Sequence, residues 1–216
     1  MPQTRKTKRE IEIKLRVTDI RAAIHKLNAI GATSKGRVFE QNTLYDTPQS
    51  DLRQRGGLLR IRIETPAIRG KKLPSAPQRI VMTTKGPPDK AGRTRKKSRY
   101  KERAEREVVV TGLSARSSDA ALRVLGFKPT FRYEKFRTSF RLGNLHLDLD
   151  ETPAGNFLEL EGQPQSIDHV ASALGYAPSA YIRGTYWEVY AADCCRHGVK
   201  PKNMVFASMK SSRPHS

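Results

Sequence analysis

Glu10-Ile11-Glu12-Ile13-Lys14 alternates charged and aliphatic side chains near the start of the chain. Successive side chains of a β-strand point to opposite faces, so Glu10, Glu12 and Lys14 share one face and the two isoleucines share the other. The stretch therefore predicts a strand whose polar face carries two carboxylates beside an ammonium group.

The same alternation recurs in several later stretches, each with charged side chains on one face. These side chains belong to Arg60, Arg62, Arg103, Glu105, Glu107, Lys135, Arg137, His146, Asp148, Asp150, Glu159 and Glu161. An antiparallel sheet with one solvated face explains such alternation in any single strand. It explains the whole set less well, because Asp, Glu, Arg and Lys dominate these faces and are rarely buried unless they are paired or bind a metal.

A closed barrel satisfies both faces of these strands if its interior is charged and helices cover its apolar exterior. We therefore predict an α+β fold: a closed antiparallel β-barrel, or tunnel, of about eight strands with a charged interior and helices packed outside. Carboxylates inside the barrel would hold a hard divalent cation through oxygen atoms, while arginine and lysine side chains would bind a polyanion.

The 216 residues fit one barrel domain with basic extensions at both ends. We expect residues 1–8 to form a basic disordered arm, residues 9–192 the tunnel domain, and residues 193–216 a basic C-terminal tail that is disordered after His197. Apolar periodicity and stop signals predict the outer elements. The expected helices cover residues 20–30, a stretch ending before Gly126, residues 166–174 and residues 179–192, and the expected long loops cover residues 65–78 and 86–98.

The formal charge of +20 indicates an anionic partner: nucleic acid, a membrane surface or a small anionic substrate. The two cysteines, Cys194 and Cys195, are adjacent, so they build neither a disulfide framework nor a zinc site. No apolar run reaches transmembrane length, and the basic N-terminus lacks the hydrophobic segment of a signal peptide. We therefore expect a cytoplasmic protein without a membrane partner.

The ordered set of charged motifs resembles the CYTH superfamily, the triphosphate tunnel metalloenzymes, over residues 8–192. The motifs are Glu10-Ile11-Glu12-Ile13-Lys14, the double arginine in Leu59-Arg60-Ile61-Arg62-Ile63, Thr83-Thr84-Lys85-Gly86, Arg103-Ala104-Glu105-Arg106-Glu107, Glu134-Lys135-Phe136-Arg137, Leu147-Asp148-Leu149-Asp150-Glu151 and Phe157-Leu158-Glu159-Leu160-Glu161-Gly162. The first motif alone is unspecific, because any charged strand could produce it. The specificity comes from the order of the whole set.

This resemblance implies a role for each charged position. Mg²⁺ or Mn²⁺ would be held by Glu10, Glu12, Glu159 and Glu161, with Asp148 or Asp150 and Glu105 or Glu107 near a second ion. The triphosphate would be bound by Lys14, Arg60, Arg62, Lys85, Arg103, Lys135 and Arg137, with Arg183 reaching the tunnel mouth. Lys14 would also be catalytic, as a base or by orienting the nucleophile.

The reaction is left open among three alternatives. The run from Leu125 to Arg137 looks most like the class IV adenylyl cyclase branch, which implies conversion of ATP to cyclic AMP and pyrophosphate. The second alternative is hydrolysis of inorganic or thiamine triphosphate, since no motif identifies adenine. A non-catalytic RNA or polyphosphate binder would use the basic loops and tails, but inward carboxylates oppose phosphate binding unless a metal intervenes.

The expected partner is thus a small-molecule triphosphate: ATP, thiamine triphosphate or tripolyphosphate. Beyond it we expect only weak, nonspecific nucleic-acid binding through the basic tails, and a monomer or homodimer.

Some of these residues also have a purely structural interpretation. Arg103 and Glu105 could simply pair with each other. His146 is predicted to be a hydrogen-bonded wall residue, because Mg²⁺ prefers oxygen ligands. The aromatic residues near the C-terminus lie at helical spacings and are predicted to pack in the core. They are Tyr181, Tyr186, Trp187 and Tyr190.

Overall fold

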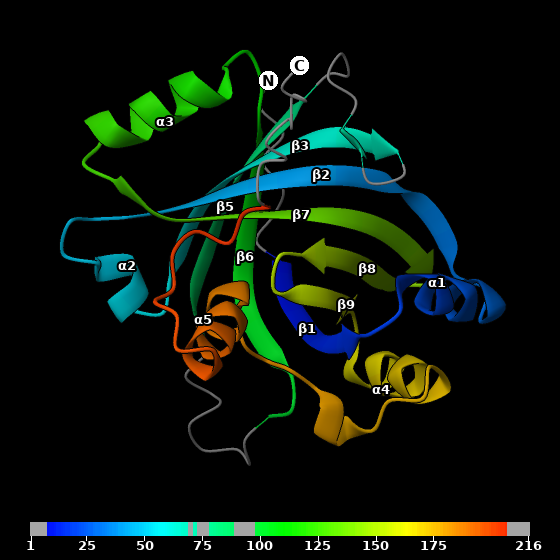
Figure 1. The fold of residues 1–216 in the computed structure, drawn as a ribbon. Coiled ribbons are helices and arrows are strands. Elements are labelled where there is room, and N and C mark those ends of the chain that lie inside the picture. The colour runs from blue at the N-terminus through cyan, green and yellow to red at the C-terminus, as the bar shows by residue number, and fades with distance from the viewer. Residues whose placement is uncertain (1–7, 69–70, 73–77, 89–97, 207–216) are drawn as a thin grey trace, which may run out of the picture.

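The computed structural model describes residues 8–68, 71–72, 78–88 and 98–206, and its main feature is a closed antiparallel barrel (Figure 1). The strands are β1 (Lys8–Val17), β2 (Thr33–Asp46), β3 (Leu58–Ile68), β4 (Lys71–Lys72), β5 (Arg79–Pro88), β6 (Lys101–Val110), β7 (Lys128–Leu142), β8 (Leu145–Thr152) and β9 (Gly155–Glu161). Neighbours follow the order β2-β7-β8-β9-β1-β6-β5-β3, and β3 pairs back with β2 to close the ring. Short β4 adds to β3 only. The predicted tunnel fold is confirmed.

Helices lie outside the barrel, as expected. They are α1 (Ile20–Ala29), α2 (Asp51–Gln54), α3 (Ala115–Val124), α4 (Pro164–Ala173) and α5 (Tyr186–Arg196). Gly31 and Gly126 follow the ends of α1 and α3 with φ of 83° and 87°, a left-handed conformation that glycine adopts without steric cost. Both helices therefore stop where the sequence indicates.

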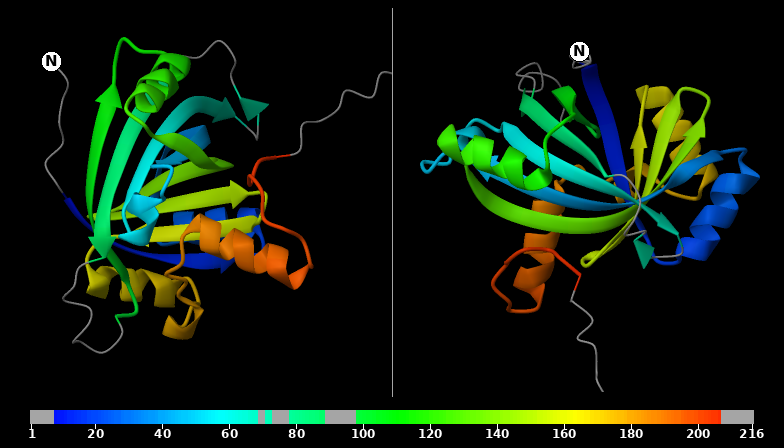
Figure 2. Two further views of the ribbon diagram at one scale, coloured as in Figure 1. Left: turned by 90° about the vertical axis from the view of Figure 1, so that its left-hand side faces the viewer. Right: turned by 90° about the horizontal axis from the view of Figure 1, so that it is seen from above.

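The outward aliphatic side chains of β1, β8 and β9 form the largest core, beneath α1 and α4 (Figures 1 and 2). Ile13, Leu147 and Leu160 are fully buried there, as are Leu27 of α1 and Ile167 of α4. Each such side chain contributes roughly 1.5–3 kcal/mol by leaving water. This burial fixes the register: a slip by one residue would send the charged face into the apolar layer and the aliphatic face into the barrel.

Two smaller apolar clusters pack elsewhere in the molecule. Leu122 of α3 packs on outward side chains of β2, β3 and β5, on a different side of the barrel from α1 and α4 (Figure 2). The other cluster joins Tyr186 of α5 to Phe131, Phe157 and Met204. Through these contacts α5 is fixed near one end of the barrel, on the same side as α2 in Figure 1.

Three predicted boundaries differ in the structure. The helix expected over 179–192 begins only at Tyr186, because Ile182 pairs in extended form with Lys14, and Thr185 and Glu188 form a capping box. The loop expected over 65–78 lies partly in strands, since β3 runs to Ile68 and β4 covers Lys71–Lys72, and residues 69–70 and 73–77 lie outside the described residues. The loop expected from residue 86 lies partly in β5, which runs to Pro88.

The C-terminal segment is also more ordered than predicted. α5 runs to Arg196, and Met204 is 1% exposed beneath β7. The Met204 N–H donates to the Arg132 carbonyl and the Glu134 N–H donates to the Met204 carbonyl, both at 2.9 Å. Residues 198–206 are therefore held on the barrel wall, and the expectation of disorder directly after His197 is wrong. Most of the expected arm and the last ten residues of the expected tail lie outside the described residues.

No helix in the described ranges is long and apolar enough to cross a membrane.

Candidate active site

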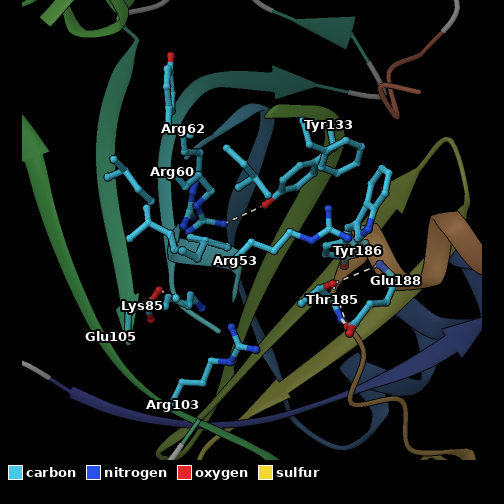
Figure 3. Close-up of a pocket in the computed structure, with 18 of the residues that line it drawn as sticks. Arg53, Arg60, Arg62, Lys85, Arg103, Glu105, Tyr133, Thr185, Tyr186 and Glu188 are labelled. Carbon is cyan, nitrogen blue, oxygen red and sulfur yellow. Dashed lines mark hydrogen bonds and ion pairs between the residues drawn. The ribbon is translucent and has the colours of Figure 1, made fainter. Parts of the chain in front are cut away.

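A cavity of about 950 Å³ occupies the barrel interior, and the charged strand faces form its walls (Figure 3). The predicted site residues that line it are Glu10, Glu12, Lys14, Arg60, Arg62, Lys85, Arg103, Glu105, Glu107, Lys135, Arg137, Asp148, Glu159 and Glu161. The period-2 pattern therefore identified the inward face of every charged strand. Residues of α2 and of the first turn of α5 line the cavity as well.

Lys14 lies at the junction of β1 and β9 and is 2% exposed. Its Nζ is 3.3 Å from Glu12 Oε1 and 3.0 Å from Glu159 Oε1. Burial by itself would lower the pKa of Lys14, but the two carboxylates outweigh it and hold the pKa above its ordinary value. Lys14 is thus a cation in this structure, and the geometry favours the orienting role predicted for it over the role of base.

Glu10 lies beside a second lysine. Lys85 Nζ donates to Glu10 Oε2 at 2.6 Å and is 3.1 Å from Glu105 Oε1. Burial, followed by repulsion from Glu12, raises the pKa of Glu10 to about 7 even though Lys85 opposes the shift. Glu10 is therefore a carboxyl that another nearby positive charge would readily ionise.

Lys101 is a site residue that the motif comparison missed. It lines the cavity, and its Nζ lies 2.5 Å from Glu12 Oε1. Burial and the neighbouring Lys14 lower its pKa, although Glu12 opposes them. The signal was present in the sequence, because Lys101 continues the alternation of Arg103, Glu105 and Glu107 by one step.

Arg137 gathers carboxylates from two neighbouring strands. Its Nη1 is 2.7 Å from Asp148 Oδ2, its Nε donates to Asp150 Oδ1 at 2.7 Å, and its Nη2 contacts Glu159. Despite burial, these carboxylates raise the pKa of Arg137, and Arg137 in turn lowers the pKa of Asp148. Arg137 therefore holds the β8 and β9 carboxylates in place.

Asp150 is fully buried and is not part of the cavity lining. Besides Arg137, it accepts from Lys135 Nζ at 2.8 Å and from the Tyr186 hydroxyl at 2.6 Å. Burial raises the pKa of Asp150 in spite of both cations. Its contacts tie β7 and β8 to α5, so it supports the site from behind.

Glu40 of β2 is a second residue that the sequence interpretation missed. It is 1% exposed, and its carboxylate lies 3.4 Å from Arg62 Nη1, 3.5 Å from Lys135 Nζ and 3.6 Å from Arg137 Nε. Burial alone would raise the pKa of Glu40, but Lys135, Arg62 and Arg137 hold it well below its usual range. The Glu40 carboxylate lies between three cationic side chains and offsets the repulsion among them.

The arginines of β3 and β6 keep unused donors. Arg60 donates to the Tyr133 hydroxyl at 3.1 Å and to Thr83 Oγ1 at 3.0 Å, and Arg62 donates to Glu107 at 2.9 Å. The Nε atoms of Arg60, Arg62 and Arg103 are nevertheless buried without a hydrogen-bond partner. A buried donor without a partner costs about 1–3 kcal/mol, so these guanidinium groups are held in the wall at some cost in stability.

Arg103 is distinctive within this group. Its side chain makes no hydrogen bond or ion pair with any residue in the described part of the chain, whereas Glu105 pairs with Lys85. The alternative that Arg103 and Glu105 simply pair with each other is therefore wrong. In Figure 3 Arg103 extends into the cavity below Lys85.

Other predicted positions have different surroundings. Arg183 is exposed, donates to the Ser98 carbonyl at 2.5 Å and does not line the cavity. His146 lies in the wall with Nε2 3.3 Å from Asp148 Oδ1, as a hydrogen-bonded wall residue should. Tyr186 packs in the core as predicted, while Trp187 packs edge-on against Phe131 and also lines the cavity.

A family model of the CYTH domain matches residues 8–177. The chain belongs to the CYTH domain family. None of the curated proteins matches it in a sequence comparison. This family acts on triphosphate substrates, and its tunnel enzymes generally use divalent metal ions.

Solved structures share the fold of this CYTH domain at low identity. A Vibrio parahaemolyticus protein provisionally described as an adenylate cyclase is 20% identical, with a TM-score of 0.62 over 85% of this chain and 98% of that chain. A Pyrococcus horikoshii OT3 protein is 24% identical, with a TM-score of 0.63 over 83% and 98%. A Hippeastrum protein reported to have a dominant triphosphatase activity is 19% identical, with a TM-score of 0.54 over 89% and 97%. At such identities the likeness shows the fold alone.

The carboxylates of this CYTH domain have the donor chemistry of a hard-cation site. Glu12 of β1 lies directly opposite Glu161 of β9, and Lys14 lies opposite Glu159, so the glutamates share one region of the wall. These carboxylates would coordinate a metal through oxygen atoms, which are the ligands that suit Mg²⁺ or Mn²⁺. Within the described ranges no three acidic, histidine or cysteine side chains converge as ligands, because lysines and Arg137 occupy the carboxylates. Burial, followed by repulsion from Glu12, raises the pKa of Glu10, so a cation bound beside it would favour the ionised carboxylate.

Proposed function

We propose that this CYTH domain is a divalent-metal-dependent enzyme that converts ATP to cyclic AMP and pyrophosphate. The observation that carries the proposal is that Arg60, Arg62 and Arg103 line the same cavity as the carboxylates. Phosphate oxygens are the acceptors that guanidinium groups bind best, and a triphosphate offers enough of them for several arginines.

The metal would be held by glutamates of β1 and β9. Glu10, Glu12, Glu159 and Glu161 supply oxygen donors on adjacent strands. A bound Mg²⁺ or Mn²⁺ offsets phosphate charge and makes phosphorus more open to attack. Its charge also suits Glu10, whose raised pKa reflects burial and the neighbouring Glu12.

The remaining side chains position the substrate. Arg60, Arg62 and Arg103 bind phosphate oxygens, and Lys14, kept cationic by two glutamates, stabilises negative charge near the metal site. Buried Asp150 anchors Lys135 and Arg137. The Lys135 ammonium group and the Arg137 guanidinium group therefore keep fixed positions in the wall. Such preorganisation is the main catalytic contribution that a protein makes to phosphoryl and nucleotidyl transfer.

Product analysis of the purified protein tests this proposal. ATP incubated with Mg²⁺ or Mn²⁺ should give cyclic AMP and pyrophosphate, because the ribose 3′-hydroxyl attacks the α-phosphorus. An ATP analogue lacking the 3′-hydroxyl should bind without cyclising. ADP and orthophosphate as the main products, or faster turnover of tripolyphosphate than of ATP, would contradict the cyclase reaction.

Hydrolysis of the terminal phosphate of a triphosphate is the second candidate. The observation that favours it is the chemistry of the charged wall. All cations of this wall suit phosphate groups, and none of them requires adenosine. Thiamine triphosphate and tripolyphosphate therefore belong in the same assay as ATP. Release of orthophosphate from all three would establish this second candidate.

A further inference from the structure

One end of the cavity differs in chemistry from the rest. Where α2 and α5 border it, the lining includes the apolar Leu44, Leu58, Phe131 and Trp187, beside the charged Asp46, Arg53, Lys128 and Glu188. Phosphate groups gain nothing from aliphatic and aromatic walls, because such walls cannot donate hydrogen bonds. This end therefore suits a different part of a ligand from the charged interior.

Trp187 and Arg53 face each other across this end. Trp187 is the second residue of α5. Arg53 lies on α2, with its guanidinium carbon 6.0 Å from the indole centroid. Figure 3 shows Arg53 reaching from the α2 side of the cavity toward Tyr186 on the opposite side. Arg53 is exposed and, in the part of the chain that the structure describes, its side chain has no hydrogen bond or ion pair.

The indole is supported from one side only. Phe131 meets Trp187 edge-on, at 4.9 Å between ring centroids and an interplanar angle of 73°. Phe131 is itself buried beside Tyr133 and Tyr190, so it provides a rigid base. Trp187 is only partly buried and lines the cavity, which leaves aromatic surface in reach of a ligand.

We propose that this end binds the planar organic group of an organic triphosphate, stacked between Trp187 and Arg53. The inference rests on the proposed function, because the triphosphate in the charged interior places the organic group here. A flat ring between two surfaces needs about 3.5–4 Å of contact distance on each side, or roughly 7–8 Å in all. The guanidinium carbon of Arg53 now lies 6.0 Å from the indole centroid, so the exposed Arg53 side chain has to shift outward to admit a ring.

Both partners suit a nucleobase. Arginine stacks its flat guanidinium on aromatic rings, and tryptophan offers the largest aromatic face among the side chains. The site thereby distinguishes ATP from inorganic tripolyphosphate, which shares the phosphate contacts and lacks the ring. Stacking accepts any base, so this subsite selects for a planar group more than for adenine.

The chain contains a single tryptophan, which makes the contact directly visible. Titration of the Mg²⁺-loaded protein with an ATP analogue that is not turned over should change the emission of Trp187. Tripolyphosphate should bind in calorimetry and leave that emission nearly unchanged. An emission change of equal size with both ligands would overturn the stacking contact.

Arg53→Ala tests the other side, with Arg55→Ala as its matched control. Arg55 is exposed at the end of the same short helix and does not line the cavity, so its removal changes the net charge equally. Arg53→Ala should weaken binding of the ATP analogue roughly five- to tenfold relative to Arg55→Ala, a modest stacking contribution. Binding of tripolyphosphate should match that of Arg55→Ala.

The outcomes separate this inference from the proposed function. Equal weakening of both ligands by Arg53→Ala would make Arg53 a phosphate contact and overturn the stacking subsite, while the triphosphate function stands. Binding of neither ligand to the wild-type protein would overturn both. A selective loss of the ATP analogue supports the subsite whether the reaction proves to be cyclisation or hydrolysis.

Discussion

Glu10 lies between the ammonium group of Lys85 and the like charge of Glu12, and its protonation state depends on this balance. Its pKa of about 7, raised first by burial and then by Glu12, means that folding favours the protonated form. A divalent cation nearby reverses that preference, because it stabilises the carboxylate. Metal binding at the proposed site would therefore be coupled to proton release from Glu10.

This balance gives a pH-dependent stability in metal-free protein. Between pH 4.5 and about 7 the native state holds a proton on Glu10 that the unfolded chain has lost, so the unfolding free energy falls as the pH rises. Glu10→Gln keeps the neutral form at every pH. From pH 5 to pH 8 in a chelator, its unfolding free energy should therefore rise relative to wild type by about 3 kcal/mol.

Urea denaturation of both proteins at the two pH values gives this difference, in which the titrating groups that do not interact with Glu10 cancel. If the unfolding free energies of the variant and the wild type differed by the same amount at pH 5 and at pH 8, the raised pKa of Glu10 would be contradicted. Adding Mg²⁺ at pH 8 should stabilise the wild type more than Glu10→Gln, since the variant lacks one of the proposed oxygen ligands.

The sequence predicted the inward charged residues because the side chains of a strand alternate between only two faces. Lys101 and Glu40 obey the same rule and could have been found by extending it along β6 and β2. Arg53 and Trp187 carry no such signal. They meet because α2 and α5, far apart in the sequence, border one end of the cavity, and only the packed barrel brings them together.

Strands and helix ends differ in how well local sequence determines them. The register of β1 and β9 follows from alternation, whereas the start of α5 depends on Ile182 pairing with Lys14 across the fold. A helical pattern of tyrosines does not reveal that competing contact. The C-terminal segment was missed for a related reason: its basic composition indicates disorder, while Met204 alone enters the core.

Met204 anchors this segment and gives a prediction about it. Met204→Ala should lower the unfolding free energy by about 2–5 kcal/mol, the usual cost of truncating a fully buried methionine. Its neighbour Val205 is 42% exposed, so Val205→Ala should stay within about 0.5 kcal/mol of wild type. Equilibrium urea unfolding followed by circular dichroism compares the three proteins. A small effect of Met204→Ala would mean that the segment contributes little to the fold.

At the scale of the whole molecule, two sources could attract a polyanion. One is the net charge of +20, spread over basic segments outside the motif strands. The other is the cavity, where carboxylates offset most of the cations and leave Arg103 unpaired among the described residues. General charge is screened by salt and accepts any polyanion, while a cavity binds a small ligand stoichiometrically.

Thermal unfolding with and without Mg²⁺ and tripolyphosphate separates the two sources. Arg103→Ala should leave the ligand-free Tm unchanged or slightly raised, because it removes a buried donor that has no partner. It should weaken tripolyphosphate binding about tenfold, which lowers the ligand-induced stabilisation by about 1.4 kcal/mol at saturating ligand. Arg21→Ala, an exposed arginine of α1 outside the cavity, removes the same charge and should keep the full stabilisation. If both variants lose stabilisation equally, net charge binds the ligand; if only Arg103→Ala does, the barrel interior is the binding site.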